Sequence, residues 1–427
     1  MPADAKRGLR PPVYIDTDAA LSKLVAALRN QVCIAVDTES NPLFAYREKL
    51  CLIQISTKSR DYLIDPLADI DLSALVPVFA DPMIVKIFHD AEFDVLMLRR
   101  TLPLQILGIF DTKVVAMALG VEAVGLAAML QESFDVTLDK KYQRSDWGMR
   151  PLTDGQLDYA RYDTHFLISL ASDLRDRLFE ADQVTQLEVA AEFQRLEQLV
   201  PEPRVFNPDD FTKVKGWEKL DPGARRVLRE LYVVRHDIAD RVDRPAFKVL
   251  SNDVLLRLAR RAPSDMATLK RDRLLPPKLC DRYGEEVMEA IARGRRLAPL
   301  PDGKIHRTKK PVDQLSEEQR ETYESLRMWR KRAAVRRKAD ASLLLPRTSM
   351  LSLCGIRPRP RDLEELRRCG VLEPWRIDYY GEGILAALLE SRKPDPKEKG
   401  GAKTGKKRYS KRRKARKRSS NSGPRME

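Results

Sequence analysis

Two carboxylates directly follow a short apolar run near the beginning of the sequence. The run Val32–Val36 has the length and composition of a buried strand, and Asp37 and Glu39 come next. Side chains two residues apart on a strand point to the same face. Two carboxylates on one face could bind a divalent cation, which prefers oxygen ligands. The alternative is a solvated strand end, because the tripeptide Ser40–Pro42 favours a turn.

Two further acids occupy places from which they could reach the same site. Asp94 lies at the start of a predicted helix, Phe93–Arg100, and Asp163 lies four residues after Tyr159 on another predicted helix. Residues four apart on a helix share one face. Four ionised carboxylates cannot share a dry site without cations, because each raises the pKa of the others. Two divalent ions about 3.5–4 Å apart would resolve this repulsion and suit an in-line phosphoryl displacement; oxygen ligands favour Mg²⁺ or Mn²⁺.

The elements that must position these acids alternate between strands and helices. A helix within 13–29 precedes the first strand, and further helices are predicted at Leu72–Phe79, Asp111–Leu119, Asp154–Glu180 and Asp182–Leu199. Strands are predicted at Val32–Glu39, Leu50–Ser56, Asp61–Asp65, Ile84–His89 and Ile106–Phe110. Thr153 and Gln156 form a capping box before the Asp154–Glu180 helix. This order predicts an α/β domain with a mixed sheet.

The rest of the chain is expected to be helical and then disordered. After the boundary at Pro201–Pro203, apolar residues at helical spacing predict two helical units, 217–294 and 316–391, with Gly294 ending a helix. The net charge of the chain is +15, and residues 393–427 carry 15 Lys or Arg against 3 Asp or Glu, a net of +12. A basic tail of this composition is predicted to be disordered.

Composition excludes several classes of protein. The five cysteines are scattered without any CxxC pair, which is typical of a reducing compartment and excludes a zinc ribbon. No apolar run reaches the ~18 residues of a membrane span. The beginning of the chain has no apolar signal core. These features predict a soluble, cytoplasmic protein.

Three short motifs carry a resemblance to a known family. DTE (37–39), HDAEFD (89–94) and YARYD (159–163) resemble the exonuclease motifs of the DEDD superfamily, in its tyrosine-containing branch. Residues 138–153 resemble the segment before the third motif in the ribonuclease D family, and both helical units resemble HRDC domains. The resemblance implies a ribonuclease-H-like exonuclease domain at 10–200, HRDC-like domains at 215–295 and 316–391, and a basic tail at 392–427.

The resemblance also implies a role for each candidate site residue. Asp37, Glu39, Asp94 and Asp163 would be metal ligands, and Tyr159 would orient the attacking water. An ordinary tyrosine has a pKa near 10 and is a poor base at neutral pH, so a positioning role is favoured. Within the second motif Asp90 and Glu92 are rival acids. We favour Asp94, because it has the register of the family's aspartate.

The segment before the third motif offers two candidate nucleic-acid contacts. Arg144 lies among several basic residues around Trp147 in a predicted loop. Arg144 could contact a phosphate, and Trp147 could either pack inside the protein or stack on a terminal base. A solvated basic loop is the alternative for Arg144.

The function that the resemblance implies is metal-dependent 3′-5′ exoribonuclease activity. The substrate would be single-stranded 3′ ends of structured RNA such as tRNA precursors, the products would be nucleoside 5′-monophosphates, and the protein would be a monomer without membrane attachment. Two alternatives stay open at this point: a DNA 3′-5′ exonuclease, and a noncatalytic RNA-binding scaffold. The carboxylate cluster argues against a scaffold, because it repels phosphate.

Overall fold

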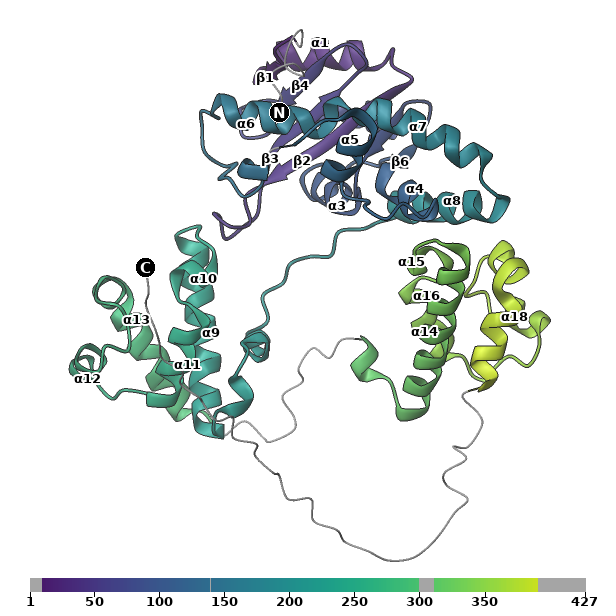
Figure 1. Ribbon diagram of the computed structural model, residues 1–427. Helices are drawn as coiled ribbons and strands as arrows, with labels where there is room; N and C mark the ends of the chain where they lie inside the picture. Colours follow the sequence, from purple (N-terminus) through teal and green to yellow (C-terminus); the bar gives the residue numbers. More distant parts are fainter. Residues whose placement is uncertain (1–9, 139, 299–310, 391–427) are drawn as a thin grey trace, which may run out of the picture.

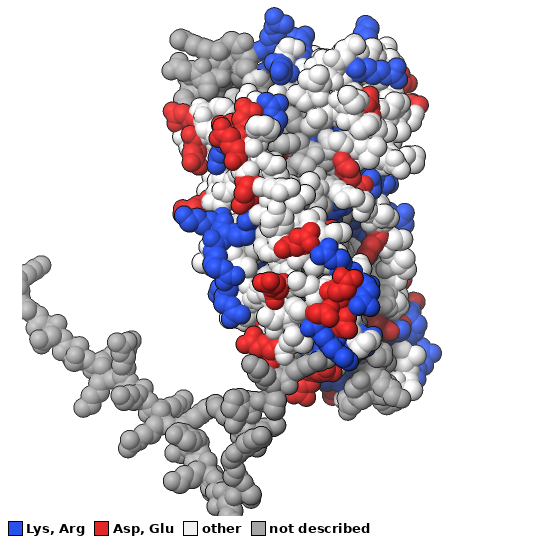
Figure 2. All heavy atoms as spheres, turned by 90° about the vertical axis from the view of Figure 1, so that its right-hand side faces the viewer, with Lys and Arg blue, Asp and Glu red and all other residues white. Residues whose placement is uncertain are grey.

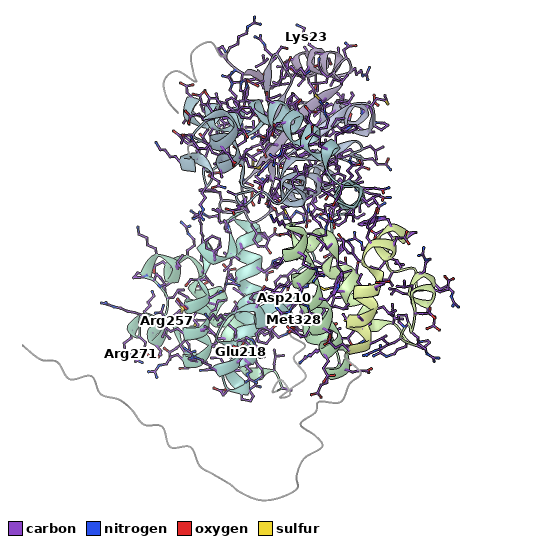
Figure 3. All side chains as sticks on the ribbon, turned by 45° about the vertical axis from the view of Figure 1, so that its right-hand side comes forward. Lys23, Asp210, Glu218, Arg257, Arg271 and Met328 are labelled. Carbon is purple, nitrogen blue, oxygen red and sulfur yellow. The ribbon has the colours of Figure 1, made fainter. Side chains whose placement is uncertain are left out.

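The protein consists of an α/β domain followed by two helical units, as a computed structural model describes it for residues 10–138, 140–298 and 311–390. Both helical units lie on the side of the α/β domain opposite α1 (Figure 1). Lys23 on α1 marks the far end of the α/β domain, whereas Arg257 and Arg271 mark the outer side of the first helical unit (Figure 3). The predicted tail, 392–427, lies outside the described residues.

The α/β domain is built on a mixed six-stranded sheet with the order β1-β4-β3-β2-β5-β6. The antiparallel pairs are β2 with β3 and β3 with β4, and the other neighbours run parallel. The strands are β1 Val13–Ile15, β2 Cys33–Ser40, β3 Leu50–Ser56, β4 Asp61–Ile64, β5 Val85–Phe88 and β6 Ile109–Asp111. The predicted mixed sheet is therefore confirmed, and β2 occupies a central position in it.

Helices cover this sheet and bury a large apolar core against it. They are α1 Asp18–Leu28, α2 Val76–Ala80, α3 Glu92–Thr101, α4 Thr112–Ala118, α5 Leu126–Phe134, α6 Asp154–His165, α7 Leu167–Glu180 and α8 Gln183–Glu197, with 3₁₀ turns at Leu72–Leu75 and Lys140–Tyr142. Sequence patterns did not predict α5, and they placed the start of the last strand three residues too early.

The predicted single helix Asp154–Glu180 is wrong, because the chain forms two helices there. Phe166 ends α6 with φ −95° and ψ −8°, and α7 begins at the next residue. The bend lets α6 pack across β2, β3 and β4 while α7 packs on α4, β2 and β5. The predicted capping box of Thr153 and Gln156 is present at the start of α6.

The two helical units have separate cores. The first contains α9 Pro222–Arg241, α10 Ala246–Val249, α11 Asn252–Arg261, α12 Met266–Arg271 and α13 Pro277–Arg296, preceded by 3₁₀ turns at Pro208–Lys213 and Trp217–Lys219. The second contains α14 Glu317–Arg337, α15 Ala341–Leu344, α16 Arg347–Gly355, α17 Leu363–Arg368 and α18 Pro374–Glu390, after a 3₁₀ turn at Pro311–Gln314.

The second helical unit docks on the α/β domain through buried contacts. Glu188 on α8 is 1% exposed and accepts a hydrogen bond from the Tyr380 hydroxyl. Arg337 donates to the Thr185 hydroxyl over 2.7 Å and pairs with Asp182. Viewed from the side of α8 and α18, basic and acidic side chains are interspersed over this part of the surface (Figure 2).

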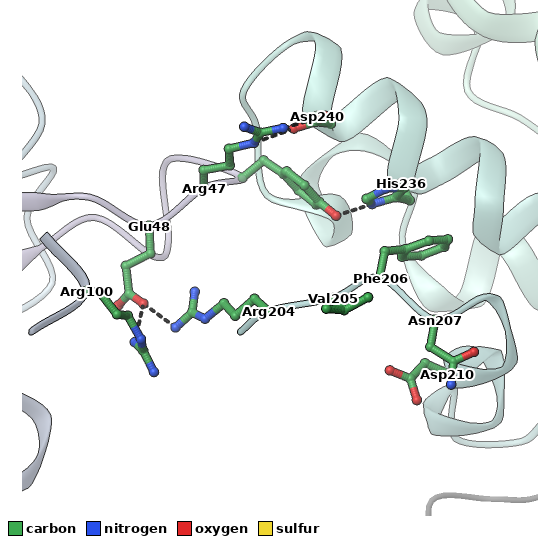
Figure 4. A pocket seen from close by; sticks show the side chains of 11 residues that line it. Arg47, Glu48, Arg100, Arg204, Val205, Phe206, Asn207, Asp210, His236 and Asp240 are labelled. Atoms are coloured by element: carbon green, nitrogen blue, oxygen red, sulfur yellow. Dashed lines mark hydrogen bonds and ion pairs between the residues drawn. The ribbon is translucent and has the colours of Figure 1, made fainter. Parts of the chain in front are cut away.

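The first helical unit instead meets the loop between β2 and β3 through mainly exposed polar contacts, with Tyr46 of the loop packed partly buried against its core. Arg47 pairs with Asp240 of α9 at 2.7 Å, and its side chain is 75% exposed. Tyr46 contacts His236, and a cleft of about 750 Å³ opens beside them between the loop, α9 and the linker at Arg204 (Figure 4). Exposed ion pairs contribute about 0–1 kcal/mol each and are screened by salt. The buried contacts of the second unit therefore fix it more firmly.

Gly294 lies inside α13, so the predicted helix end at this residue is wrong. A Cβ at Gly294 would lie 2.7 Å from the Val227 Cα of α9, closer than real Cβ atoms approach. The glycine therefore allows the backbones of α13 and α9 to pack closely.

Gly294→Ala should destabilise the protein by about 1–3 kcal/mol, because the added methyl group overpacks the contact between α13 and α9. Gly355→Ala is the matched control, since a Cβ there would meet nothing within 4 Å. Chemical denaturation of both variants measures the difference in unfolding free energy. Equal stability of the two variants would contradict the close approach.

Candidate metal centre

Three of the predicted ligands converge at the centre of the α/β domain. Asp37 and Glu39 lie on β2, and Asp163 lies on α6, which crosses the sheet above that strand. One carboxylate oxygen from each residue lies within 4.8 Å of those of the other two. All three residues are partly exposed, so the cluster is open to a ligand from solvent. A divalent cation fits this set of hard oxygen donors.

Asp94 approaches the same cluster from α3 and is 5% exposed. The hydroxyl of Thr38, which lies between Asp37 and Glu39, donates to the Asp94 carboxylate over 2.5 Å. This hydrogen bond holds the start of α3 against β2. The two rival acids point elsewhere: Asp90 pairs with Lys113 at 2.5 Å, and Glu92 pairs with Arg195 at 2.7 Å.

A buried carboxylate, Asp111, shapes the turn that leads to Asp94. Asp111 ends β6 and is 1% exposed. Its two oxygens accept hydrogen bonds from the backbone amides of Asp90 and Ala91 at 3.1 and 2.7 Å, and it also caps α4. Asp90 has a φ of +72°, a conformation that Asn and Asp adopt more readily than other non-glycine residues. The residue type at Asp90 thus suits the turn.

A second buried network anchors α6 to the sheet. Asp61 on β4 is 4% exposed and accepts hydrogen bonds from Arg161 at 2.7 Å, His165 at 2.9 Å and Ser56 at 2.9 Å. Burial alone would raise the pKa of Asp61, but the hydrogen bonds from His165 and Ser56, together with Arg161, hold it below its usual range. Sequence patterns assigned His165 no role; it positions the helix that carries Asp163.

The four clustered carboxyl groups all have raised pKa values. Burial, followed by the charge of Asp163, raises the pKa of Asp37. Burial, followed by the charge of Asp37, raises the pKa of Asp94, although hydrogen bonds from Thr38 oppose this rise. Burial and the neighbouring carboxylates raise the pKa of Glu39 to about 10. Burial raises the pKa of Asp163 to about 7 although the Tyr159 hydroxyl donates to it. Cations would relieve this repulsion.

Tyr159 lies beside Asp163 on the same face of α6. Burial, followed by the charge of Asp163, raises the pKa of Tyr159 above its usual value of 10. The hydroxyl therefore stays protonated at neutral pH, and it can donate a hydrogen bond but cannot act as a base there.

The two candidate nucleic-acid contacts in the loop before α6 differ in their exposure to solvent. Arg144 is exposed and stays available to a phosphate. Trp147 is 1% exposed and packs against Tyr159 with a centroid distance of 5.9 Å. This burial contradicts a stacking contact between Trp147 and a base, and the ring instead supports α6. Arg150 pairs with Asp65 at 2.6 Å and donates to the Trp147 carbonyl, which holds the loop in place.

The remaining histidine near the site, His89, is structural. His89 hydrogen-bonds the Thr112 hydroxyl over 2.9 Å, and burial lowers its pKa to about 4. The ring is therefore neutral at physiological pH.

Among the described residues, no helix combines the length and apolarity that crossing a bilayer demands.

In the absence of metal, the thermal stability that the carboxyl cluster contributes should fall as the pH rises. The folded protein holds protons on Glu39 and Asp163 up to about pH 10 and 7, whereas the unfolded chain releases them near pH 4. Stability from these groups is complete below pH ~4 and is lost as the pH rises through the folded pKa values. Calorimetry in chelator between pH 5 and 8 measures the effect.

Asp163→Asn is the control for this pH dependence, since it removes one acid from the cluster. The melting temperature of this variant should fall less steeply with pH than that of the wild type. Mn²⁺ should raise the wild-type melting temperature most at the high end of the range. Parallel curves for the two proteins would contradict the coupling among the carboxyl groups.

Comparison with known proteins agrees with this geometry. Residues 12–178 match the family described as 3′-5′ exonuclease, and residues 224–291 and 319–388 each match the HRDC domain. The exosome complex exonuclease RRP6 of Saccharomyces cerevisiae is 37% identical over 60% of this chain, which spans 37% of the length of that relative.

Relatives that match this chain over most of their own length also indicate an exonuclease. A ribonuclease D from Gluconacetobacter diazotrophicus is 33% identical over 73% of this chain and 78% of its own. The catalytic core of RRP6 from Trypanosoma brucei has a TM-score of 0.61 at 29% identity, covering 66% of this chain and 79% of its own. Escherichia coli RNase D shares the fold, with a TM-score of 0.61 at 24% identity over 89% of this chain and 99% of its own. The chain belongs to the ribonuclease D family of 3′-5′ exonucleases.

Proposed function

We propose that this protein is a metal-dependent 3′-5′ exoribonuclease. The observation that carries the proposal is the convergence of Asp37, Glu39, Asp94 and Asp163, with Tyr159 beside them. In the proposed reaction, water attacks the terminal phosphodiester bond of an RNA strand. The bond to the departing 3′ oxygen breaks, and one nucleoside 5′-monophosphate leaves in each cycle.

Divalent ions fit the four carboxylates, because added positive charge offsets the burial and the mutual repulsion that raise their pKa values. We propose two such ions, Mg²⁺ or Mn²⁺, which would stabilise charge on the attacking and departing oxygens. Asp37, Glu39, Asp94 and Asp163 would hold the ions. Hard carboxylate oxygens favour these ions over soft metal cations.

Tyr159 would position the attacking water. Its hydroxyl already donates to Asp163 and stays protonated at neutral pH. A protonated hydroxyl at the edge of the cluster can donate a hydrogen bond to water or phosphate. Because this hydroxyl keeps its own proton, it takes no proton from the neighbouring carboxyl groups.

The proposed substrate is the single-stranded 3′ end of a structured RNA, such as a tRNA precursor. RNA is favoured because the relatives include proteins named ribonuclease D. The two helical units beside the α/β domain offer surface for the body of a folded RNA while its end reaches the metal centre (Figure 1). Arg144 is exposed on the loop before α6 and is a candidate phosphate contact. We expect a monomer that acts in the cytoplasm.

Digestion of matched, 5′-labelled RNA and DNA oligonucleotides in Mn²⁺ tests the activity and the sugar preference together. The labelled RNA should shorten one nucleotide at a time from the 3′ end, and a chelator should stop the digestion. Asp37→Asn should be inactive under the same conditions, since it removes a ligand charge. Faster shortening of DNA would support the DNA exonuclease instead, and binding without shortening would support a scaffold.

Tyr159→Phe should lower turnover by roughly 10²–10⁴-fold, the range typical of lost water positioning or proton-transfer help. RNA affinity should barely change, because the ring and its packing on Trp147 remain. Single-turnover kinetics and a binding titration separate the two quantities. An equal loss of affinity and turnover would make the tyrosine a substrate contact.

Asp94→Ala should abolish hydrolysis, whereas Glu92→Ala should keep most of it. Asp94 lies close enough to Asp37 to interact with its charge and accepts a hydrogen bond from Thr38, while Glu92 pairs with Arg195 of α8. The two variants alter acids only two residues apart on one helix, so they control for effects on α3 itself. The reverse order of activities would mean that α3 presents a different acid.

A further inference from the structure

We propose that Gln54 on β3 is a positioning residue for Asp37, whose carboxylate accepts a hydrogen bond from the Gln54 side-chain amide when the cluster holds a divalent cation. The inference rests on the proposed metal centre and adds to it a residue that none of the three motifs contains.

The sheet places Gln54 directly beside Asp37. In the antiparallel ladder of β2 and β3, the two residues are Cα partners. Directly paired residues of an antiparallel ladder point to the same face, with Cβ atoms ~4.5–5.5 Å apart. Ser56 on the same face of β3 hydrogen-bonds Thr164 of α6 over 2.7 Å. Gln54 therefore lies on the α6 side of the sheet, where Asp163 faces Asp37.

The Gln54 side chain is buried without any hydrogen-bond partner among the described residues. It is 0% exposed, and neither its amide nitrogen nor its amide oxygen has a partner. Its neighbour Ser56 is equally buried, yet it is hydrogen-bonded to both Asp61 and Thr164. Buried polar groups are nearly always paired, and an unpaired one is destabilising. Without a metal ion, the fold would be more stable with an apolar side chain in place of Gln54.

The amide chemistry suits a carboxylate that must stay ionised. Asp37 has the backbone amide of Thr38 as a hydrogen-bond donor, while burial and Asp163 oppose its charge. The Gln54 amide can add a second donor. Because it is neutral, it does not compete with the cation as a lysine would. Hydrogen bonds to ligating carboxylates fix their orientation, and losing one typically costs 10–100-fold in metal affinity.

Gln54→Met tests this role, because Met keeps the unbranched shape and removes the amide. Calorimetric titration with Mn²⁺ alone should give an affinity 10–100-fold below that of the wild type. The melting temperature of the metal-free variant should equal or exceed that of the wild type, since an unpaired buried amide is gone. A purely structural role would instead lower this temperature and leave the Mn²⁺ affinity unchanged.

Thr212→Val is the control, as Thr212 is 3% exposed and donates a hydrogen bond to the Asp209 carbonyl in the first helical unit, away from the cluster. It should lower the melting temperature and keep the wild-type Mn²⁺ affinity. Gln54→Leu repeats the measurement if Gln54→Met does not fold. Wild-type Mn²⁺ affinity in the Gln54 variant overturns the inference and leaves the metal centre standing. A wild-type protein that binds no Mn²⁺ overturns the metal centre itself.

Discussion

Mutual repulsion among four carboxylates is the constraint on which the rest of this structure depends. Asp37, Glu39, Asp94 and Asp163 come from β2, α3 and α6, and each has a pKa above its usual value. Left to themselves such groups would move apart or keep their protons. The fold must therefore hold them together through contacts elsewhere.

Buried polar networks supply this restraint on both sides of the cluster. Asp61 ties α6 to the sheet through Arg161, His165 and Ser56. Asp111 fixes the turn before α3 by accepting from two backbone amides. Each of these two carboxylates is almost fully buried yet fully hydrogen-bonded, which is the condition under which a buried charge is tolerated. Gln54 differs from these two carboxylates, because its buried amide lies unpaired beside Asp37.

Local patterns predicted the parts of the fold that depend on neighbours in sequence. The apolar run before Asp37 formed β2, and the Thr153 capping box formed the start of α6. Sequence patterns failed where packing between distant segments determines the local structure. The bend at Phe166 follows the sheet beneath the two helices, and Gly294 serves the approach of α13 to α9. Sequence patterns placed Trp147 in a loop, but its ring is buried in an apolar cluster with residues of β3, β4 and α6.

A crystal structure of the protein grown with Mn²⁺ and measured at the manganese absorption edge tests directly whether the four carboxylates hold two divalent ions. Two anomalous peaks are expected among the carboxylates of Asp37, Glu39, Asp94 and Asp163, with the Gln54 amide turned toward Asp37. Occupied manganese sites elsewhere, with these four carboxylates bare, would contradict this expectation.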